Sequence, residues 1–417
     1  MSARVMLVLP TETYRATAFL RAAATLGLQV VVASNEAPTL ASLMEGRVLT
    51  LDLHRPDDSA DRAAAFHRMW HVDAVVGVDE ASVVTAVRVA DRLGTARRNP
   101  VAAVEATRDK RFMRKRLTAA ALAQPRYFET DVDADGTAVD EAIRVVGLPC
   151  VVKPVDRAGS QGVIRANTRE AVVSAVRRVG QLLRATCVDG PTPQLLIESY
   201  VDGVEVAVEG LLQDGSLDVI ALFDKPDPLT GPFFEETLYV TPSRLDIATQ
   251  AAVAEAVRAA ITALGLRHGP IHAEVRVRDA RPVVIEVAAR SIGGLCSQAI
   301  RLACSDAPDV VRSIEDVILR QACGLPLGSI SLADDACGVL MLPTPAAGIL
   351  KAVTGVDDAA AVVGISGLTI AVPIGEVVTP LPEGDRYLGF VFARGSTPAG
   401  VEAALRKAQS LISLDVA

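Results

Sequence analysis

Two glutamates in the segment "GPIHAEVRVRDARPVVIEVAARSIGG", residues 269–294, interrupt runs that otherwise have the composition of buried strands. If residues 279–281 form the loop of a β-hairpin, Arg278 faces Pro282, and the register places Glu274 directly opposite Glu286. Two carboxylates in that position repel each other unless a cation lies between them or one of them is protonated. The pattern therefore predicts an oxygen-only site for Mg²⁺, which commonly shares such ligands with substrate phosphates.

The same register predicts one polar face and one apolar face for the hairpin, because side chains alternate along each strand. The polar face carries His272, Glu274, Arg276, Glu286, Ala288 and Arg290. The apolar face carries Ile271, Ala273, Val275, Ile285 and Val287. The alternative to a metal site is a solvated amphipathic hairpin in which Arg276 and Arg290 balance the two acids, and the hairpin alone leaves both open.

A lysine before a glycine-containing turn is the second candidate, in "PCVVKPVDRAGSQGV". A strand ends at Lys153, and the turn "AGSQG" leads into a second strand. Backbone N–H groups of such a turn can surround phosphate oxygens while the lysine supplies a positive charge. The segment lacks the G-x-x-x-x-G-K-[ST] pattern of a Walker A loop, and an ordinary hairpin with an exposed lysine is the alternative.

A third candidate is "LLIESYVDGVEVAVEG", a strand, a turn with glycine and a second strand. The backbone from Glu198 to Val201 could read an adenine edge, and Glu205 could accept hydrogen bonds from ribose hydroxyls. By itself the segment is also an ordinary strand-turn-strand unit with two acids.

The composition limits the class of protein that positions these residues. The chain has 417 residues, 50% hydrophobic and 22% charged, with a net charge of −8. Because phosphate neutralisation needs clustered cations, this balance argues against a nucleic-acid surface. The longest weakly polar stretch, residues 359–375, is broken by Gly, Ser, Thr and Pro and predicts short strands rather than a membrane helix. The cysteines are scattered with no C-x-x-C pair, which predicts a reduced cytoplasmic protein; they are Cys150, Cys187, Cys296, Cys304, Cys323 and Cys337.

The order of elements predicts an α/β chain in several parts. In residues 1–100 strands alternate with helices, beginning with "VMLVLP", which indicates a parallel sheet covered on both faces. No G-x-G-x-x-G follows the first strand, so the region is Rossmann-like without a dinucleotide fingerprint. A single basic helix is expected over residues 106–122. From about Ile330 short strands punctuated by Gly and Pro, and a last amphipathic helix, predict a separate small α+β domain.

Taken in order, these segments resemble the ATP-grasp superfamily. The resemblance rests on "DKRFMR", the strand ending in Lys153, "IESYVDGVEV", "IHAEVRV" and "VIEVAARSIGG". It implies a Rossmann-like pre-ATP-grasp domain (1–100), a two-lobed ATP-grasp clamp (101–328, with a flexible lid lobe at about 120–200) and a C-terminal α+β lid domain (329–417). The segments "GPFFEETLYVTPS", "PAAGILKAVTGVDDA" and "GDRYLGFVFARG" look most like the L-amino-acid ligases, or dipeptide synthetases.

The resemblance also implies roles for individual residues. Lys110 and Lys153 match the lysines that hold ATP phosphates, and Ser160, Gln161 and Gly162 match the loop that covers them. Glu198, Ser199 and Val201 match the adenine hinge, with Glu205 at the ribose. Glu274 and Glu286 match the acids that bind Mg²⁺ (or Mn²⁺), and Arg290 matches the arginine near the reacting phosphoryl group. Glu80, Glu236, Tyr239, Gly293 and Gly294 fall where relatives line the amino-acid site.

The sequence departs from the superfamily pattern in two places. Ala288 stands where an Asn often follows the second metal-binding Glu, and Tyr239 stands where many relatives have His. The implied function is an ATP-dependent carboxylate-amine ligase that joins two amino acids through an acyl phosphate. The alternatives are an ATP-grasp ligase of another acceptor class, as in purine or cofactor biosynthesis, and a regulatory protein that binds ATP without turnover. A homodimer is the base-rate expectation for such a soluble enzyme.

Overall fold

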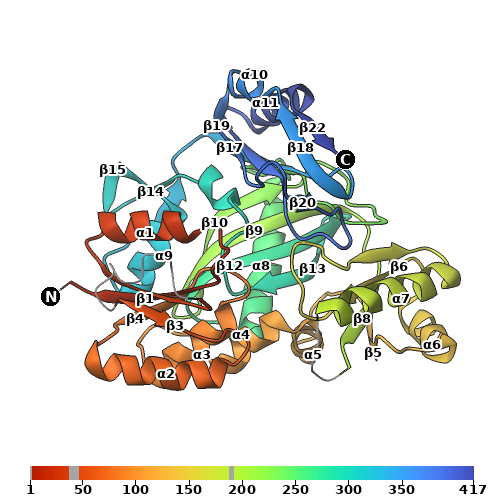
Figure 1. Ribbon diagram of the computed structural model, residues 1–417, viewed down its shortest axis with the longest axis horizontal. Helices are drawn as coiled ribbons and strands as arrows, with labels where there is room; N and C mark the ends of the chain where they lie inside the picture. The colour runs from red at the N-terminus through yellow and green to blue at the C-terminus, as the bar shows by residue number, and fades with distance from the viewer. Residues whose placement is uncertain (1, 37–46, 187–191) are drawn as a thin grey trace.

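The first sheet lies at the N-terminal end of the chain, at the lower left of Figure 1. The computed structural model describes residues 2–36, 47–186 and 192–417. The sheet is parallel, with strand order β3-β2-β1-β4. Its strands are β1 (Arg4–Leu9), β2 (Gln29–Ser34), β3 (Val48–Thr50) and β4 (Ala74–Gly77), and its helices are α1 (Ala16–Thr25), α2 (Pro56–Met69) and α3 (Val83–Leu93). The predicted parallel sheet is confirmed.

Strand β1 shows why its sequence is a continuous apolar run. Val5 and Leu7 pack with Phe19 on one side of the sheet, whereas Met6 and Val8 belong to a separate core on the other side. A strand buried on both faces cannot alternate apolar with polar residues, as a half-exposed strand does.

Two helices lead from this sheet to the lid lobe, at the lower right of Figure 1. They are α4 (Val101–Arg108) and α5 (Lys110–Ala119), so the single basic helix expected over residues 106–122 is wrong. Asp109 separates them, because its backbone is extended and its carboxylate accepts the N–H of Arg111 (2.9 Å) as the cap of α5. The lobe has the sheet order β5-β8-β6-β7. Its elements are β5 (Tyr127–Asp131), α6 (Gly136–Val146), β6 (Cys150–Pro154), β7 (Ile164–Ala166), α7 (Arg169–Thr186) and β8 (Gln194–Ser199).

An eight-stranded sheet forms the middle of the molecule, in the order β13-β12-β9-β10-β11-β17-β21-β19. Its strands are β9 (Val204–Gln213), β10 (Ser216–Asp224), β11 (Leu238–Thr241), β12 (Gly269–Arg278), β13 (Arg281–Ala288), β17 (Ala336–Leu342), β19 (Ile365–Ile370) and β21 (Gly389–Gly395). The last three belong to the C-terminal region, so the sheet continues across the predicted boundary at residue 329. The three-part division itself stays a prediction.

Helix α8 (Ile247–Leu264) packs against this sheet. Among the described residues it is the one helix whose length and composition would allow a membrane span. Val253, Val257 and Ile261 on one side of it are buried in the core beside β12, as in the core helix of a folded domain.

The remaining elements lie in the chain after strand β13. They are η2 (Cys296–Ala299), β14 (Leu302–Cys304), β15 (Ala307–Arg312), α9 (Ile314–Cys323), β16 (Ile330–Leu332), β18 (Gly348–Thr354), α10 (Val356–Ala360), β20 (Val377–Val378), α11 (Pro398–Leu411) and β22 (Ser413–Val416). In Figure 1 the C-terminal elements lie at the top of the molecule, and the chain next to β20 reaches down towards β6 of the lid lobe. The described cysteines are free thiols, and Cys187 lies outside the described residues.

The β12–β13 hairpin confirms the predicted register by an unexpected route. Glu274 pairs with Glu286 and His272 with Ala288, as expected, but the turn is shorter and Arg278 pairs with Arg281. A β-bulge between Glu274 and Val275, where Ile285 is the extra residue of β13, restores the pairing. The loop prediction of residues 279–281 is therefore wrong by one residue.

The bulge also corrects the predicted apolar face. Ile285 lines the cleft beside Glu286 instead of packing in the core. The other four predicted core residues of the hairpin, Ile271, Ala273, Val275 and Val287, are fully buried.

Candidate functional site

A cleft of about 550 Å³ lies where the N-terminal sheet, the lid lobe, the large sheet and the C-terminal region meet. It is lined by all of the predicted site residues except Gly162. The Gly162 N–H donates to the carbonyl of Pro382 (2.8 Å), on the C-terminal region. Residues from far-apart parts of the sequence therefore share one cavity.

Lys153 and Glu198 form a buried charged group on the lid lobe. Lys153 Nζ lies 2.7 Å from Glu198 Oε2, and Arg114 Nε donates to Glu198 Oε1 (2.7 Å). Burial alone would raise the pKa of Glu198, but Arg114 and Lys153 together lower it to about 2. Burial lowers the pKa of Lys153, and Glu198 opposes that change. Because Lys153 is only 5% exposed, the alternative of an ordinary hairpin with an exposed lysine is excluded.

Lys110 links the N-terminal end of α5 to the metal candidate Glu286. Its Nζ lies 3.2 Å from Glu286 Oε1 and donates to the carbonyl of Arg157 (2.7 Å). The Lys110 backbone N–H also donates to Val155 (2.9 Å), which fixes the start of the helix against the chain after Lys153. The two predicted lysines thus enter the cleft from adjoining segments.

The glycine-containing turn after β6 is held in shape by its backbone and by the C-terminal region. Ser160 has φ +58° and Gly162 has φ +73°, where a Cβ on Gly162 would lie 2.7 Å from the Pro154 ring. Gln161 Nε2 donates to the carbonyl of Glu383 (2.9 Å). The turn therefore needs glycine at residue 162.

The predicted hinge joins the lid lobe to the large sheet. Ser199 exchanges hydrogen bonds with the Arg126 backbone through its Oγ (3.0 Å) and its N–H (2.8 Å). The Val201 carbonyl accepts from Arg276 Nη1 (2.7 Å), and Arg276 Nε donates to Glu205 (2.7 Å). The side chain expected at a ribose is thus already ordered by an arginine that the sequence had placed only on the polar face of the hairpin.

A buried lysine that the prediction missed stands among three glutamates. Lys225 Nζ lies 2.7 Å from Glu205 and 3.0 Å from Glu274, and it also contacts Glu236. The three carboxylates offer oxygens within 4.8 Å of one another. Burial and repulsion by Glu274 raise the pKa of Glu236 to about 7, although Lys225 lowers it in part. A signal was present in the sequence, because "VIALFDK" ends an apolar strand in lysine as "PCVVK" does.

His272 and Glu209 form a second pair that the prediction did not assign. His272 Nδ1 contacts Glu209, whose other oxygen accepts the N–H of Ile292 (2.9 Å). Burial lowers the pKa of His272, but Glu209 and Glu274 outweigh it and raise the pKa to about 9. This pair ties β9 and β12 to the turn that precedes Gly293.

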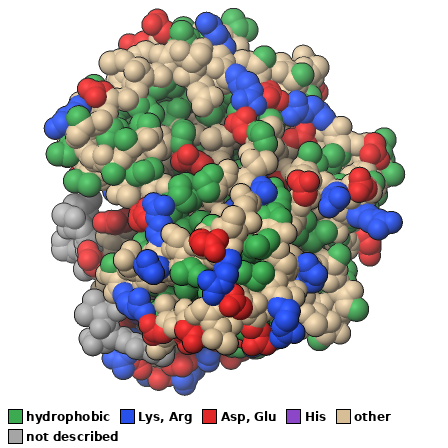
Figure 2. All heavy atoms as spheres, turned by 90° about the vertical axis from the view of Figure 1, so that its right-hand side faces the viewer, with side chains coloured by type: hydrophobic (Ala, Val, Ile, Leu, Met, Phe, Trp, Pro, Cys, Tyr) green, Lys and Arg blue, Asp and Glu red, His purple; other side chains and the backbone are tan. Residues whose placement is uncertain are grey.

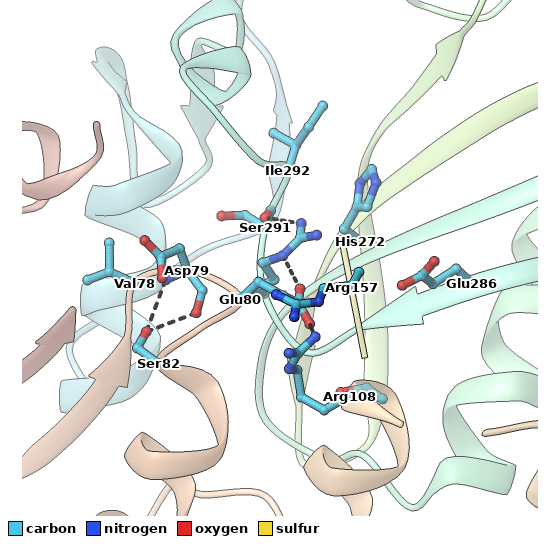
Figure 3. A network of polar contacts seen from close by, with 12 residues as sticks. Val78, Asp79, Glu80, Ser82, Arg108, Arg157, His272, Glu286, Ser291 and Ile292 are labelled. Carbon is cyan, nitrogen blue, oxygen red and sulfur yellow. Dashed lines mark hydrogen bonds and ion pairs between the residues drawn. The ribbon is translucent and has the colours of Figure 1, made fainter. Parts of the chain in front are cut away.

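A carboxylate that follows strand β4 of the N-terminal sheet faces an arginine that follows strand β13 of the large sheet. Glu80 contacts Arg290 and lies 3.3 Å from Arg108 Nη1. Figure 3 shows the Glu80 carboxylate next to Arg108, with Glu286 and His272 beyond it on the strands of the sheet. The preceding residue, Asp79, has one buried carboxylate oxygen, Oδ1, without a hydrogen-bond partner among the described residues. Burial would raise the pKa of Glu80, but Arg290 and Arg108 lower it.

Aromatic side chains line the cleft on the side of Lys225, whose Nζ lies 5.1 Å from the centre of the Tyr239 ring. Tyr239 is 2% exposed, and burial raises its pKa well above the ordinary value. Tyr387 packs edge-on against Phe390, with ring centroids 6.0 Å apart. A Cβ on Gly294, which has φ +57°, would lie 2.9 Å from the Phe390 ring.

Three family models match successive parts of the chain, from its N-terminal to its C-terminal region. An ATP-grasp N-terminal domain matches residues 20–95, an ATP-grasp domain matches 146–299, and an L-amino acid ligase C-terminal domain 2 matches 340–417. The chain belongs to the ATP-grasp superfamily. The mixed α/β fold expected for a member of that superfamily is confirmed.

Individual relatives agree with the family. The alanine–anticapsin ligase of Bacillus subtilis (strain 168) is 28% identical over 259 residues, which are 58% of this chain and 53% of that ligase. This ATP-grasp chain spans about half the length of the curated relatives it matches first.

Solved structures agree with the fold. The L-amino acid ligase from Bacillus licheniformis has a TM-score of 0.82 and 24% identity, covering 100% of this chain and 99% of that one. A carboxyaminoimidazole ribonucleotide synthase from Aspergillus clavatus, complexed with ATP, has a TM-score of 0.75 and 16% identity, covering 98% of each chain.

The carboxylates of this ATP-grasp chain suit a hard divalent cation. Glu274 and Glu286 are cross-strand neighbours, and both side chains reach the cleft. Each has a lysine near one oxygen, Lys225 beside Glu274 and Lys110 beside Glu286. Ala288 is 2% exposed and offers no oxygen from its side chain. Two carboxylates and substrate phosphates are the usual protein ligand set for Mg²⁺.

Proposed function

We propose that this chain is an ATP-dependent carboxylate-amine ligase that forms an amide bond between two amino acids and releases ADP and phosphate. The observation that carries the proposal is the pair of opposite charges, Glu80 and Arg290, that face each other in the cleft. An amino acid has an ammonium and a carboxylate; Glu80 contacts Arg290, and the charge of Arg290 also acts on the neighbouring Asp79. The buried Asp79 oxygen would gain its missing hydrogen bond from the ammonium.

The chemistry of activation suits the charges of the cleft. A substrate carboxylate oxygen attacks the γ-phosphorus of ATP, and the bond between that phosphorus and the bridging oxygen breaks. The products of this step are an acyl phosphate and ADP. An amine nitrogen then attacks the acyl carbon, loses a proton, and phosphate leaves. Lys110, Lys153 and Arg290 would stabilise the negative charge on the transferring group. No side-chain nucleophile is needed.

Glu274 and Glu286 would hold Mg²⁺, with Mn²⁺ as a substitute. When bound, the ion would neutralise phosphate charge. The adenine would lie against the backbone of Glu198, Ser199 and Val201, with Glu205 at the ribose.

Shielding from water is the expected role of the loop after β6. An acyl phosphate hydrolyses if water reaches it, so Ser160, Gln161 and Gly162 would cover the phosphates. The contact of Gln161 with Glu383 supports a covering position, because it joins the loop to the opposite wall of the cleft.

The amino-acid substrates would lie between Glu80, Arg290 and the apolar wall. Glu236, Tyr239, Gly293 and Gly294 would shape that pocket together. The names of the relatives support this substrate class, since they include an alanine–anticapsin ligase and a D-alanine–D-alanine ligase of Xylella fastidiosa.

The decisive experiment is an ADP-release screen with pairs of amino acids and Mg²⁺, followed by mass identification of the product. The proposal requires that ADP release depends on both a carboxylate and an amine. Turnover with sugar-phosphate amines but not with amino acids would support the purine-type alternative. Binding of Mg·ATP by calorimetry, with no ADP formed across the whole panel, would support a regulatory protein.

Two expectations accompany this proposal. We expect a homodimer, which size-exclusion chromatography with light scattering would test, and a cytoplasmic location. On the face drawn in Figure 2, Lys and Arg side chains are interspersed with Asp and Glu, so the signs of charge alternate there. This pattern fits small-molecule partners better than a nucleic acid.

A further inference from the structure

One segment of the C-terminal region, residues 380–387, joins the lid lobe to the cleft. The carboxylate of Glu383 accepts two hydrogen bonds from Arg178 on α7 (2.6 and 2.9 Å). Its backbone carbonyl accepts from Gln161, and the preceding carbonyl of Pro382 accepts from Gly162. The lid lobe and its phosphate-covering loop therefore fix the position of this segment.

Arg386, three residues after Glu383, lines the cleft without a carboxylate partner. It donates to the carbonyl of Val377 (3.3 Å), and within residues 2–36, 47–186 and 192–417 it has no ion pair. Every other basic side chain that lines the cleft is ion-paired; these are Arg108, Lys110, Lys153, Arg157, Arg276 and Arg290. Among the described residues, Arg386 is thus an exposed cation at the cleft that has no ion pair with a protein carboxylate.

Arg386 lies near aromatic side chains that line the cleft. Its charge acts on Tyr14 of the N-terminal domain: burial raises the pKa of that phenol, and Arg386 lowers it in part. The Tyr14 ring packs against Phe390 (6.3 Å between centroids), and Phe390 contacts Tyr387. Asp385 acts on the same phenol but has no ion pair with Arg386 among the described contacts. The phosphate lysines Lys110 and Lys153 enter from a different wall.

We propose that Arg386 binds the free carboxylate of the amino acid that supplies the amine. This inference rests on the proposed ligase function. The first amino acid loses its carboxylate charge when it becomes an acyl phosphate, whereas the second keeps a carboxylate throughout and carries it into the product. A carboxylate at the mouth of the cleft can be bound by the exposed Arg386, because an arginine fork offers two hydrogen bonds to a carboxylate.

The inference also specifies the class of amine substrate. An α-amino acid with a free carboxylate is accepted, and an amine without an anionic group is a poor substrate. Because residues 380–387 contact the covering loop, the same segment would hold the second substrate and the closed lid together.

The test compares Arg386→Gln and Arg386→Lys with the wild-type enzyme, using an accepted amino acid and its primary carboxamide as the amine. For Arg386→Gln we expect the KM of the amino acid to rise roughly 10- to 100-fold, the worth of hydrogen bonds between charged groups. The KM of the carboxamide is expected to be high already in the wild type and should stay unchanged in Arg386→Gln. The effect of removing the arginine and the effect of removing the substrate carboxylate therefore do not add. Arg386→Lys should recover part of the loss.

The matched control is Arg281→Gln, which removes an exposed arginine at the hairpin turn, outside the cleft. Equal effects of Arg386→Gln on the acid and the carboxamide would overturn the assignment and leave the ligase function intact. A rise confined to the KM of ATP would overturn it in favour of a phosphate contact. A wild-type protein that joins no pair of amino acids would refute the proposed function and this assignment together.

Discussion

Replacing Glu198 by glutamine would remove one charge and almost no volume from the lid lobe. Glu198 is 3% exposed and accepts hydrogen bonds from Arg114, which is fully buried, while Lys153 is its second partner. In Glu198→Gln both cations would stay buried without a carboxylate. Breaking a buried ion pair in this way typically costs about 3–5 kcal/mol of stability.

The pKa of Glu198 gives a second value for the same cost. It lies at about 2 in the folded protein against an ordinary 4.5, and that difference corresponds to roughly 3 kcal/mol at neutral pH. Because the folded pKa is the lower one, this stability is complete above pH 4.5 and is lost as the pH falls towards 2. The two routes agree on a loss of about 3 kcal/mol in Glu198→Gln.

Urea titration followed by circular dichroism at pH 7 would measure the change in unfolding free energy. Glu129→Gln is the matched control, since Glu129 lies on the neighbouring strand β5 and pairs with Lys115 at the surface (2.9 Å), where such a pair contributes less than about 1 kcal/mol. A loss below about 1 kcal/mol in Glu198→Gln would refute the reasoning. So would an acid-unfolding profile below pH 4.5 that runs parallel to that of the wild type.

Three further predictions concern the cleft. Glu286→Ala should reduce turnover at least about 100-fold while circular dichroism shows an intact fold, and a near-normal rate would contradict the metal assignment. Gly294→Ala should lower the unfolding free energy by roughly 1–3 kcal/mol, because the new Cβ meets Phe390 and φ is positive; Gly293→Ala, with open space around it, is the control and should change little. The unfolding free energy of Glu236→Gln, relative to that of the wild type, should increase as the pH rises from 5 to 8. The reason is that the Glu236 carboxyl, with a folded pKa of about 7, ionises less readily in the folded protein than in the unfolded chain, so the wild type loses stability over this range. Unfolding midpoints at both pH values would measure this, and parallel values would count against the raised pKa.

The sequence was sufficient for the parallel sheet and for the face that the hairpin turns to the cleft. Glu274 and Glu286 were predicted as neighbours, although the turn was misjudged by one residue and Ile285 was assigned to the core. The turn residues Asp279 and Ala280 both have positive φ, but "DA" lacks the glycine that marks such a turn. A β-bulge leaves no periodic pattern in the sequence. It could therefore not be predicted that a bulge would offset the shorter turn and keep Glu274 opposite Glu286.

The partners of the predicted residues could not be found from spacing. Lys225 contacts Glu274 across 49 residues of chain, and Arg290 contacts Glu80 across 210. Such pairs depend on how separate sheets meet, which local patterns do not encode. The resemblance supplied a role for the Glu198 segment at the adenine, whereas the structure shows its carboxylate bound by Arg114 and Lys153. The sequence therefore predicted which residues reach the cleft, but not which charged side chains lie next to them.

The continuous eight-stranded sheet has a consequence for recombination among relatives. Strand β17 pairs with β11, with Val339 opposite Tyr239, so a wall of the proposed amino-acid pocket borders a strand from the C-terminal region. A chimera that replaced only residues 340–417 would break β17 internally and pair one parent's strand edge with another's. In chimeras between relatives, substrate preference should therefore follow the parent that supplies both β11 and β17. Chimeras that fold should have their junctions in the connections outside these two strands.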